Sequence, residues 1–333
     1  MKSKKRKAAI FCNLQERLNR VYTTRHRRQI EERTDCYPVI ITSENFGQHA
    51  PYLEDLEVIF TTWGMPVLSA GEIERLPALR AVFYAAGSVQ SFARPFLERN
   101  ILIFSAWAAN AIPVAEFTLA QILLSNKGYF RNSSESRFRS DADRAFLGRG
   151  NYGESVALLG AGQIGQRVIK LLQPFNLKVL VFDPFLPEDS AEMLGVTRVT
   201  LEEAFQESYV VSNHLANLPP THKMLRGAHF ASMRKDATFI NTGRAQTVHQ
   251  VEMVKVLEER PDLLALLDVY HYPDEAGDRL HQLSNVRLTT HIAGSMHDEQ
   301  HRMADWMIDE FINWSQKNTA RYQVSLEMLA TMA

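Results

Sequence analysis

The segment SVALLGAGQIGQRVIKLLQPFNLKVLVFD covers residues 155–183. It begins with an apolar run, and a second apolar run leads to Asp183 at its end. Between the two runs, Gly160, Gly162 and Gly165 have GxGxxG spacing, and the apolar residues that follow recur at helical intervals. The pattern predicts a strand, a tight turn, a helix and a second strand, which is the arrangement of a dinucleotide-binding unit.

Each glycine of this motif has a physical task in such a unit. Gly160 permits the tight turn, Gly162 lets the backbone approach a pyrophosphate, and Gly165 lets the helix pack closely on the strand. The free N–H groups and the positive dipole at the helix start would hold the phosphates. Asp183 would accept both ribose hydroxyls and repel a 2′-phosphate, and Pro184 rather than an arginine follows it. We therefore expect NAD rather than NADP.

The chain of 333 residues is long for a single hydrophobic core and suggests two domains. Hydrophobic residues at 45% and a net charge of −1 indicate a globular protein without a basic field for nucleic acid. Cys12 and Cys36 form neither a disulfide framework nor a metal-binding spacing, and we expect no metal. HDEQH at 297–301 lacks the Glu that a zincin needs directly after its first His. The two cysteines suit a reducing cytoplasm, and the net charge gives no reason to expect a nucleic-acid partner. No apolar segment looks long enough to span a membrane, so we expect no membrane partner.

Short apolar runs alternate with helical patterns along the whole chain. Residues 14–33 have the pattern of one helix. The predicted strands are 8–12, 38–42, 58–61, 79–84 and 101–104 before the glycine motif, and 209–212, 238–241, 264–269 and 286–289 after it. Such alternation predicts parallel sheets with helices on both faces. The expected fold class is α/β, with two Rossmann-like, doubly wound domains and a cleft between them that holds the substrate.

Two further helical patterns define the expected domains. Residues 113–130 form an expected interdomain helix, with Pro113 in its first turn. Residues 296–315 should return the chain to the first domain. We expect a substrate domain at 1–130 plus 296–333 and an NAD-binding domain at 131–295.

Three polar residues follow or end predicted strands of the nucleotide domain. They are Arg244 in FINTGRA, Asp268 in ALLDVY and His291 in LTTHIAG. In open α/β sheets, ligands bind at the carboxyl ends of the strands. Hydride transfer from a secondary alcohol needs a base for the hydroxyl proton, and histidine suits that task near neutral pH. Arginine offers a bidentate fork for an anionic substrate, so the set predicts an oxidoreductase.

Six segments together resemble the D-isomer-specific 2-hydroxyacid dehydrogenase family, which includes D-lactate, hydroxypyruvate and 3-phosphoglycerate dehydrogenases. They are AAGSV (85–89), NAIPVAEFTLAQIL (110–123), GAGQIG (160–165), FINTGRA (239–245), LLDVY (266–270) and NVRLTTHIAG (285–294). The likeness covers roughly residues 58–314. It implies an NAD-dependent enzyme, a homodimer, that interconverts a small D-2-hydroxy acid and its 2-keto acid in the manner of a glyoxylate/hydroxypyruvate reductase or phosphoglycerate dehydrogenase.

The resemblance also implies residue roles. His291 would be the acid/base, Arg244 would hold the substrate carboxylate and polarise its carbonyl, and Asp268 would contact the nicotinamide carboxamide. The implied substrate contacts are Ala86, Gly87, Ser88, Arg244 and Trp63, although Trp63 could equally pack in the core. The implied cofactor contacts are Gly160, Gly162, Gln163, Ile164, Gly165, Asp183, His214, Leu215, Ala216, Thr242, Gly243, Arg244, Asp268, His291 and Gly294.

One departure from the family pattern affects the acid/base. The family carries a Glu five residues after the Asp of its DV motif, and that Glu orients the His. Pro273 stands there in this chain, and a one-residue shift would let Asp274 or Glu275 take its place. The alternative is an NAD(H)-sensing, corepressor-like binding protein with weak or no turnover, which the basic start MKSKKRK also favours. The presence of both Arg244 and His291 favours the enzyme.

Overall fold

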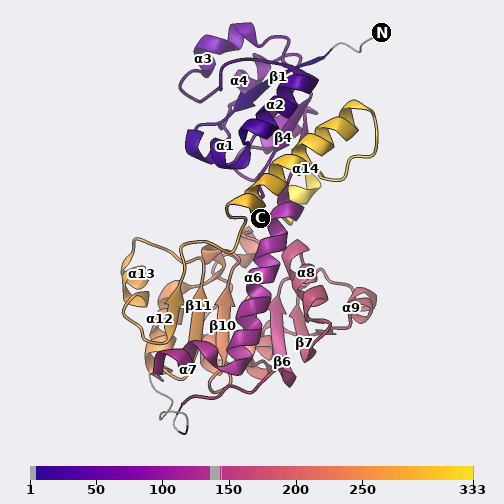
Figure 1. The fold of residues 1–333 in the computed structure, drawn as a ribbon. Helices are drawn as coiled ribbons and strands as arrows, with labels where there is room; N and C mark the ends of the chain where they lie inside the picture. Colours follow the sequence, from indigo (N-terminus) through magenta and orange to yellow (C-terminus); the bar gives the residue numbers. More distant parts are fainter. Residues whose placement is uncertain (1–4, 136–142, 144, 333) are drawn as a thin grey trace. The chain divides into compact units, whose positions relative to one another are not determined.

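The computed structural model describes residues 5–135, 143 and 145–332 (Figure 1). It divides into two compact units, of which unit 1 comprises Met1–Ala111 and Ser295–Ala333 and unit 2 comprises Ile112–Gly294. Each unit has one largely parallel sheet with helices, which confirms the predicted α/β class with two Rossmann-like domains.

The strands of unit 1 form a six-stranded sheet of order β13-β5-β4-β3-β1-β2. They are β1 (Arg6–Phe11), β2 (Thr34–Cys36), β3 (Val58–Thr61), β4 (Ala81–Tyr84), β5 (Leu102–Ser105) and β13 (Gln323–Val324). All pairs are parallel except β13 with β5. The predicted strand 38–42 is wrong, because Ile41 makes only an isolated bridge to Phe11 and Pro38 lacks the N–H that a ladder needs.

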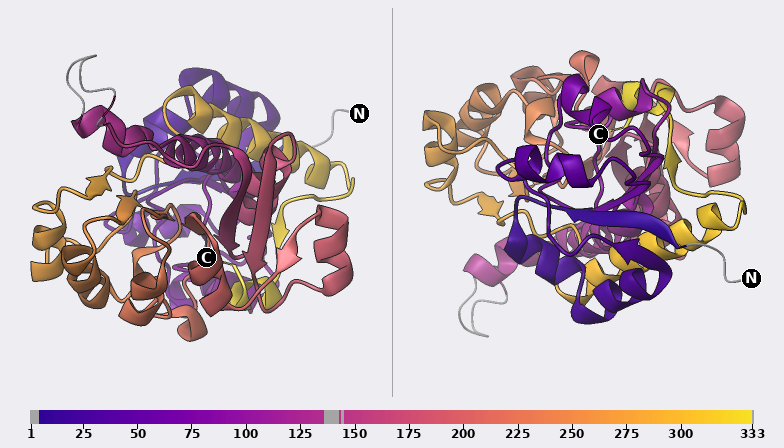
Figure 2. Two further views of the ribbon diagram at one scale, coloured as in Figure 1. Left: turned by 90° about the horizontal axis from the view of Figure 1, so that it is seen from below. Right: turned by 90° about the horizontal axis from the view of Figure 1, so that it is seen from above.

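The helices of unit 1 cover both faces of this sheet. They are α1 (Gln15–Val21), α2 (Thr24–Arg33), α3 (Phe46–His49), α4 (Ala70–Glu74), α5 (Arg94–Leu97) and α14 (Asp298–Ser315), with 3-10 turns at Ala50–Tyr52 and Glu327–Ala330. The single helix predicted over 14–33 is wrong. Thr23 is extended and caps α2, because its N–H and hydroxyl meet His26 Nδ1 at 3.1 and 2.9 Å. Helix α14 packs beside α1 and α2 (Figure 2).

The sheet of unit 2 has seven parallel strands in the order β12-β11-β10-β9-β6-β7-β8. They are β6 (Tyr152–Leu159), β7 (Asn176–Phe182), β8 (Thr197–Arg198), β9 (Val210–Asn213), β10 (Thr238–Asn241), β11 (Leu264–Leu267) and β12 (Val286–Leu288). Strand β6 pairs with both β7 and β9, so the chain order reverses there. Ligands of doubly wound sheets bind at the carboxyl ends of the strands beside such a reversal.

The helices of unit 2 lie on both faces of its sheet (Figure 1). They are most of α6 (Trp107–Lys127), α7 (Tyr129–Glu135), α8 (Gln163–Leu172), α9 (Glu188–Leu194), α10 (Leu201–Glu207), α11 (Gly227–Ser232), α12 (Gln250–Glu259) and α13 (Glu275–Leu280), with 3-10 turns η3 (Pro219–Thr221) and η4 (Ala245–Thr247). Helices α6, α8 and α9 bury apolar residues against one face, and α10 to α13 bury theirs against the other.

Helix α6 differs from its predicted form in two respects. It begins before Pro113, which lies inside the helix rather than in its first turn, because alanine-rich residues upstream favour helix. Its Ala115 and Ile122 belong to the core of unit 2. The division after Ala111 therefore falls upstream of the boundary expected at 130/131.

Helix α6 is also long and apolar enough to cross a membrane by length and composition alone, contrary to the expectation from the sequence. Half of that apolar window, 50%, is buried within the structure. A core helix passes the same test, so the composition of α6 carries no membrane assignment.

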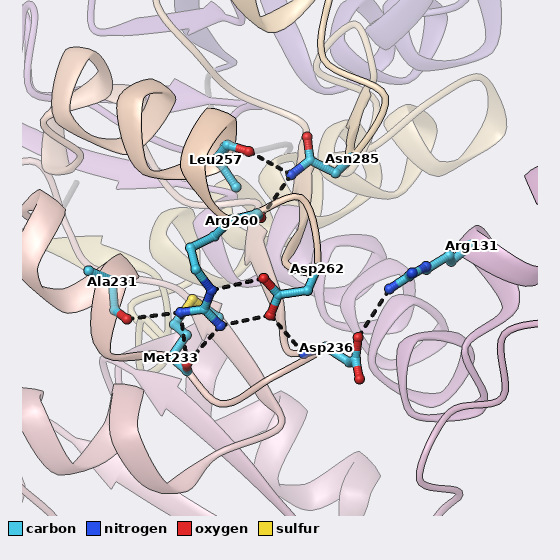
Figure 3. Close-up of polar contacts among 8 residues, drawn as sticks. All are labelled: Arg131, Ala231, Met233, Asp236, Leu257, Arg260, Asp262 and Asn285. Atoms are coloured by element: carbon cyan, nitrogen blue, oxygen red, sulfur yellow. Dashed lines mark hydrogen bonds and ion pairs between the residues drawn. The ribbon is translucent and has the colours of Figure 1, made fainter.

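Ion pairs and caps hold the amino ends of the strands in unit 2 (Figure 3). Arg260 donates to both oxygens of Asp262, at 2.8 and 2.7 Å, just before β11. Arg131 of α7 pairs with Asp236 at 3.1 Å, just before β10, and Asn285 caps the end of α12. This network lies at the strand ends opposite to those that carry Arg244, and its role is structural.

Candidate active site

The glycine motif forms the tight turn between β6 and α8. Gly160 has a φ of +98°, and a Cβ there would lie 3.0 Å from the carbonyl oxygen of His214. A Cβ on Gly165 would lie 2.1 Å from the carbonyl oxygen of Gly160, so the helix and the turn meet without room for a side chain. Gly162 is the N-cap of α8 and faces open space. The turn thus leaves the helix start open to a phosphate.

Asp183 lies at the end of β7 and contacts this turn. Its Oδ2 accepts the N–H of Ala161 at 2.7 Å, and its Oδ1 accepts the N–H of Phe185 at 2.8 Å. Each carboxylate oxygen has a second lone pair that can accept a ribose hydroxyl. Gln163 and Ile164 are the first residues of α8. Asp183, the residue expected to select the ribose, therefore joins the end of β7 to the glycine turn at Ala161.

His214, Leu215 and Ala216 follow β9 on the other side of the chain reversal. His214 Nε2 lies 3.0 Å from the Ser212 hydroxyl, while its Nδ1 is buried and has no hydrogen-bond partner in the described part of the chain. Burial lowers the pKa of His214 to about 4, so the ring is neutral near neutral pH. An orphaned buried nitrogen beside the glycine turn is a contact available to a ligand.

Arg244 follows β10 together with Thr242 and Gly243. Its Nη1 donates to the carbonyl oxygen of Gly243 at 2.9 Å. No carboxylate forms an ion pair with the guanidinium within residues 5–135, 143 and 145–332, and burial lowers the pKa of Arg244. Thr242 meets Thr118 of α6, with 3.1 Å between the hydroxyl oxygens. A largely buried cation without an anionic partner favours an anionic ligand.

Asp268 follows β11 and holds the loop that carries His291. The buried carboxylate accepts hydrogen bonds from the Thr289 hydroxyl at 2.6 Å, the Ile292 N–H at 2.7 Å and the Ala293 N–H at 3.0 Å. His291 has a φ of +62° and is exposed, and its ring makes no hydrogen bond to any other described residue. The loop, which ends at Gly294, is thus fixed while the imidazole stays free to meet a substrate.

The two candidate partners of His291 lie elsewhere in unit 2. Asp274 is the N-cap of α13, where its Oδ1 accepts the N–H of Gly277 at 2.6 Å and an amide N–H of Gln250 at 3.3 Å. Glu275 begins α13. Both line a groove between α12 and α13, and neither contacts His291 by a hydrogen bond or ion pair among the residues that the structure describes. The structure does not bring the imidazole together with either carboxylate.

Three of the predicted substrate residues of unit 1, Ala86, Gly87 and Ser88, lie in the loop after β4, and Trp63 follows β3. The N–H groups of Gly87 and Ser88 make no hydrogen bond within the described segments, whereas the carbonyl oxygens of Ala86 and Gly87 accept the Ser105 hydroxyl at 2.9 and 2.6 Å. Free N–H groups at a strand end suit an anion. Trp63 is partly buried and packs against the hydrophobic core on both sheet faces. This agrees with the alternative that Trp63 packs in the core.

Sequence reasoning missed the polar residues that support these loops. Asn110 of α6 accepts the Ser295 N–H at 3.0 Å in unit 1. In unit 2, buried Asn213 and Asn241 join the ends of β9 and β10 at 3.0 Å, and Thr247 bonds to Asn213 at 2.8 Å. A signal was present for two of them, because Asn213 and Asn241 are polar residues at the ends of the predicted strand regions 209–212 and 238–241.

Comparison with known proteins identifies the family. Residues 119–293, more than half of the chain, match the model of the D-isomer specific 2-hydroxyacid dehydrogenase, NAD binding domain. The chain belongs to this family. It is therefore an NAD-dependent enzyme of the 2-hydroxyacid dehydrogenases, which act on the CH–OH group of donors.

Relatives differ in how much of their length the chain matches. A Bacillus subtilis protein predicted to be a 2-hydroxyacid dehydrogenase is 30% identical over 68% of this chain and 67% of its own. Glyoxylate reductase of Korarchaeum cryptofilum is 28% identical over 74% of this chain and 76% of its own length. D-3-phosphoglycerate dehydrogenase of Methanocaldococcus jannaschii is 27% identical over 74% of this chain but 48% of its own length.

Solved structures share the fold. D-mandelate dehydrogenase of Rhodotorula graminis has a TM-score of 0.79 at 18% identity, covering 96% of this chain and 98% of that one. D-2-hydroxyisocaproate dehydrogenase has a TM-score of 0.76 at 20% identity, and the match covers 96% of this chain and 99% of that one. At these identities the likeness establishes the fold alone.

The cofactor of the family is NAD, and the residues of unit 2 fit it. Gly162 leaves the start of α8 open to the pyrophosphate, Asp183 can accept the ribose hydroxyls, and the buried Nδ1 of His214 lacks a partner. When bound, NAD supplies the acceptor and donor of hydride.

Proposed function

We propose that this enzyme interconverts a small D-2-hydroxy acid and its 2-keto acid. The observation that carries the proposal is Arg244, a largely buried guanidinium at the carboxyl end of β10 that has no carboxylate partner among the residues the structure describes. A substrate carboxylate would supply the missing anion, and the planar fork of arginine suits it bidentately. Within unit 1, the N–H groups of Gly87 and Ser88, which make no hydrogen bond in the described segments, are suited to an anion.

The chain's own residues then divide the work of the reaction. Arg244 binds the carboxylate and places C2, and its positive charge stabilises the oxygen on C2 as charge develops there. An imidazole nitrogen of His291 accepts the hydroxyl proton in oxidation and returns it to the carbonyl oxygen in reduction. Asp268 keeps the His291 loop in place through Thr289, Ile292 and Ala293.

The experiment follows NADH absorbance with glyoxylate, hydroxypyruvate and pyruvate, and compares the wild type with Arg244→Lys. A point charge cannot reproduce a bidentate grip. We expect kcat/KM for the best keto acid to fall about 10- to 100-fold in the variant. NADH affinity, measured by fluorescence titration, should change little. Exposed Arg226, replaced in the same way, is the matched control and should leave both quantities unchanged. If NADH affinity falls as much as turnover, Arg244 is a cofactor or structural residue.

One observation favours a second candidate, an NAD(H)-sensing, corepressor-like protein. His291 has no acidic partner among the described residues, so no carboxylate there orients its ring for proton transfer. The same assay separates the candidates. Binding of NADH without turnover of any of the three keto acids would favour the sensor.

We also propose a homodimer formed through unit 2 and a cytoplasmic location. Among the described residues of the segment 124–152, unit 2 exposes the large apolar side chains of Leu124, Tyr129, Leu147 and Tyr152, and a second copy would cover them. The free thiols Cys12 and Cys36 suit a reducing compartment. Light scattering of the eluted protein tests the dimer, and a monomer at all concentrations would refute it.

A further inference from the structure

Thr247 closes the short turn that follows Arg244. Arg244 is the N-cap of η4 and is extended, with φ −136° and ψ 135°. Both the N–H and the hydroxyl of Thr247 donate to the carbonyl oxygen of Arg244, at 3.3 and 2.8 Å. These two bonds fix the peptide plane that leaves Arg244.

Asn213, at the end of β9, sets the direction of the Thr247 hydroxyl. The Nδ2 group of Asn213 donates to Thr247 Oγ1 at 2.8 Å. Because the hydroxyl accepts on that side, its own hydrogen is free to point at the Arg244 carbonyl. Both side chains are fully buried, with 0% exposure, so water does not compete for these bonds.

The same amide also acts on the other side of Arg244. Asn213 Nδ2 donates to Asn241 Oδ1 at 3.0 Å, and that oxygen accepts the N–H of Gly243 at 3.1 Å. The Thr242–Gly243 peptide and the Arg244–Ala245 peptide are therefore both linked to the Asn213 side chain, the first through Asn241 and the second through Thr247. A Cβ on Gly243 would lie 3.0 Å from the Asn213 carbonyl oxygen, so glycine keeps the two strand ends close.

The direction of the guanidinium depends on this backbone. Arg244 donates from Nη1 to the carbonyl oxygen of the adjacent Gly243 at 2.9 Å. No other described residue holds the guanidinium by a hydrogen bond or ion pair. A rotation of either peptide would turn the side chain and its carboxylate-binding edge, and small misplacements of such groups are costly to catalysis.

We infer that Thr247 is a positioning residue that aims Arg244 at the substrate, with Asn213 orienting its hydroxyl. The inference rests on the proposed role of Arg244 as the carboxylate ligand. It adds a specific device to that role: a hydrogen-bond relay from β9 through Thr247 to the arginine.

The test compares Thr247→Val, which removes the hydroxyl at nearly constant volume, with Thr247→Ser, which keeps it. We expect Thr247→Val to lower kcat/KM for the keto acid about three- to tenfold, chiefly through KM, and to leave NADH affinity unchanged. Thr247→Ser should recover most of the loss. A valine variant with wild-type kcat/KM, or equal losses in the serine and valine variants, would overturn the inference.

A double-variant cycle tests the part played by Asn213. If Asn213 acts through Thr247, the loss in Asn213→Leu/Thr247→Val is smaller than the product of the two single losses. Losses that multiply would show independent action and refute the relay. Thermal unfolding of every variant gives a readout for packing, and a fall in Tm with unchanged keto-acid KM would assign Thr247 a structural role only. Thr247→Ala serves in the same comparison if the valine variant does not fold.

Arg244→Lys in the same assay separates this inference from the proposed function. If Arg244→Lys loses keto-acid turnover and Thr247→Val does not, the positioning role is wrong and the carboxylate role stands. If Arg244→Lys leaves kcat/KM unchanged, the carboxylate role fails and the positioning role falls with it.

Discussion

Asp268 Oδ1 accepts the backbone N–H of Ile292 at 2.7 Å, which ties the end of β11 to the residue directly after His291. The same carboxylate holds Ala293 and Thr289. His291 has a φ of +62°, a region that residues other than glycine rarely adopt. Three hydrogen bonds to a buried carboxylate offset the cost of that backbone and fix the loop.

Asp268→Asn should therefore act on the position of His291. The amide presents a donor where the carboxylate presented an acceptor, so at least one of the three hydrogen bonds is lost. We expect kcat for keto-acid reduction to fall about 10- to 100-fold, the effect of about 1.5–3 kcal/mol, with NADH affinity nearly unchanged. Exposed Asp278, changed to Asn, is the matched control. A parallel loss of NADH affinity would instead support the nicotinamide contact that the family resemblance implies.

The capping role of Asp274 predicts how substitutions of Asp274 and of Glu275, the first residue of α13, affect stability and the pH profile. Asn also caps helices well, so Asp274→Asn should change stability by a few tenths of a kcal/mol, whereas Asp274→Ala should lose about 1 kcal/mol. Neither Asp274→Asn nor Glu275→Gln should move the pH profile of keto-acid reduction, because neither carboxylate contacts His291. Urea unfolding and initial rates across pH check both points. A profile displaced to lower pH by either amide would identify that residue as the partner.

His214 makes stability depend on pH. Burial lowers its pKa from 6.5 to about 4, so between these values the unfolded chain binds more protons than the folded one. The contribution of neutral His214 to the free energy of unfolding is fully present above the pKa of the unfolded chain. It is lost as the pH falls toward the pKa of the folded protein. At about pH 5 the loss should be about 2 kcal/mol.

The measurement is urea unfolding at about pH 7.5 and about pH 5 for the wild type and His214→Gln. We expect the glutamine variant to lose less stability between the two pH values. Exposed His222, changed to Gln, should behave as the wild type. An equal loss in the wild type and in His214→Gln would remove His214 as the cause.

Much of the nucleotide unit could be predicted because local pattern and tertiary position agree there. The run 238–241 is flanked by turn residues and forms β10 with those bounds. Arg244, Asp268 and His291 could be placed at one sheet edge because parallel strands end on the same side. The failures have two causes. Ile41 meets Phe11 by one bridge only, and the capping box that starts α2 at Thr23 uses His26 in place of the usual Glu or Gln.

Side-chain partners could not be predicted from spacing. Nothing in the sequence distance between Asp268 and Ile292 shows that a carboxylate faces that N–H, because the contact depends on the loop after β12. Asp274 lies close to the position of the family Glu, yet the chain enters a helix there and the carboxylate caps it. The link from Asn213 to Thr247 likewise depends on the approach of two strand ends.

The most direct test of the enzyme mechanism is the rate of keto-acid reduction by His291→Ala at saturating NADH. If His291 transfers the proton, kcat should fall about 10²- to 10⁴-fold while NADH affinity and Tm stay close to those of the wild type. Exposed His222 replaced by Ala is the control and should retain the wild-type rate. A His291→Ala variant that keeps the wild-type kcat would contradict the mechanism.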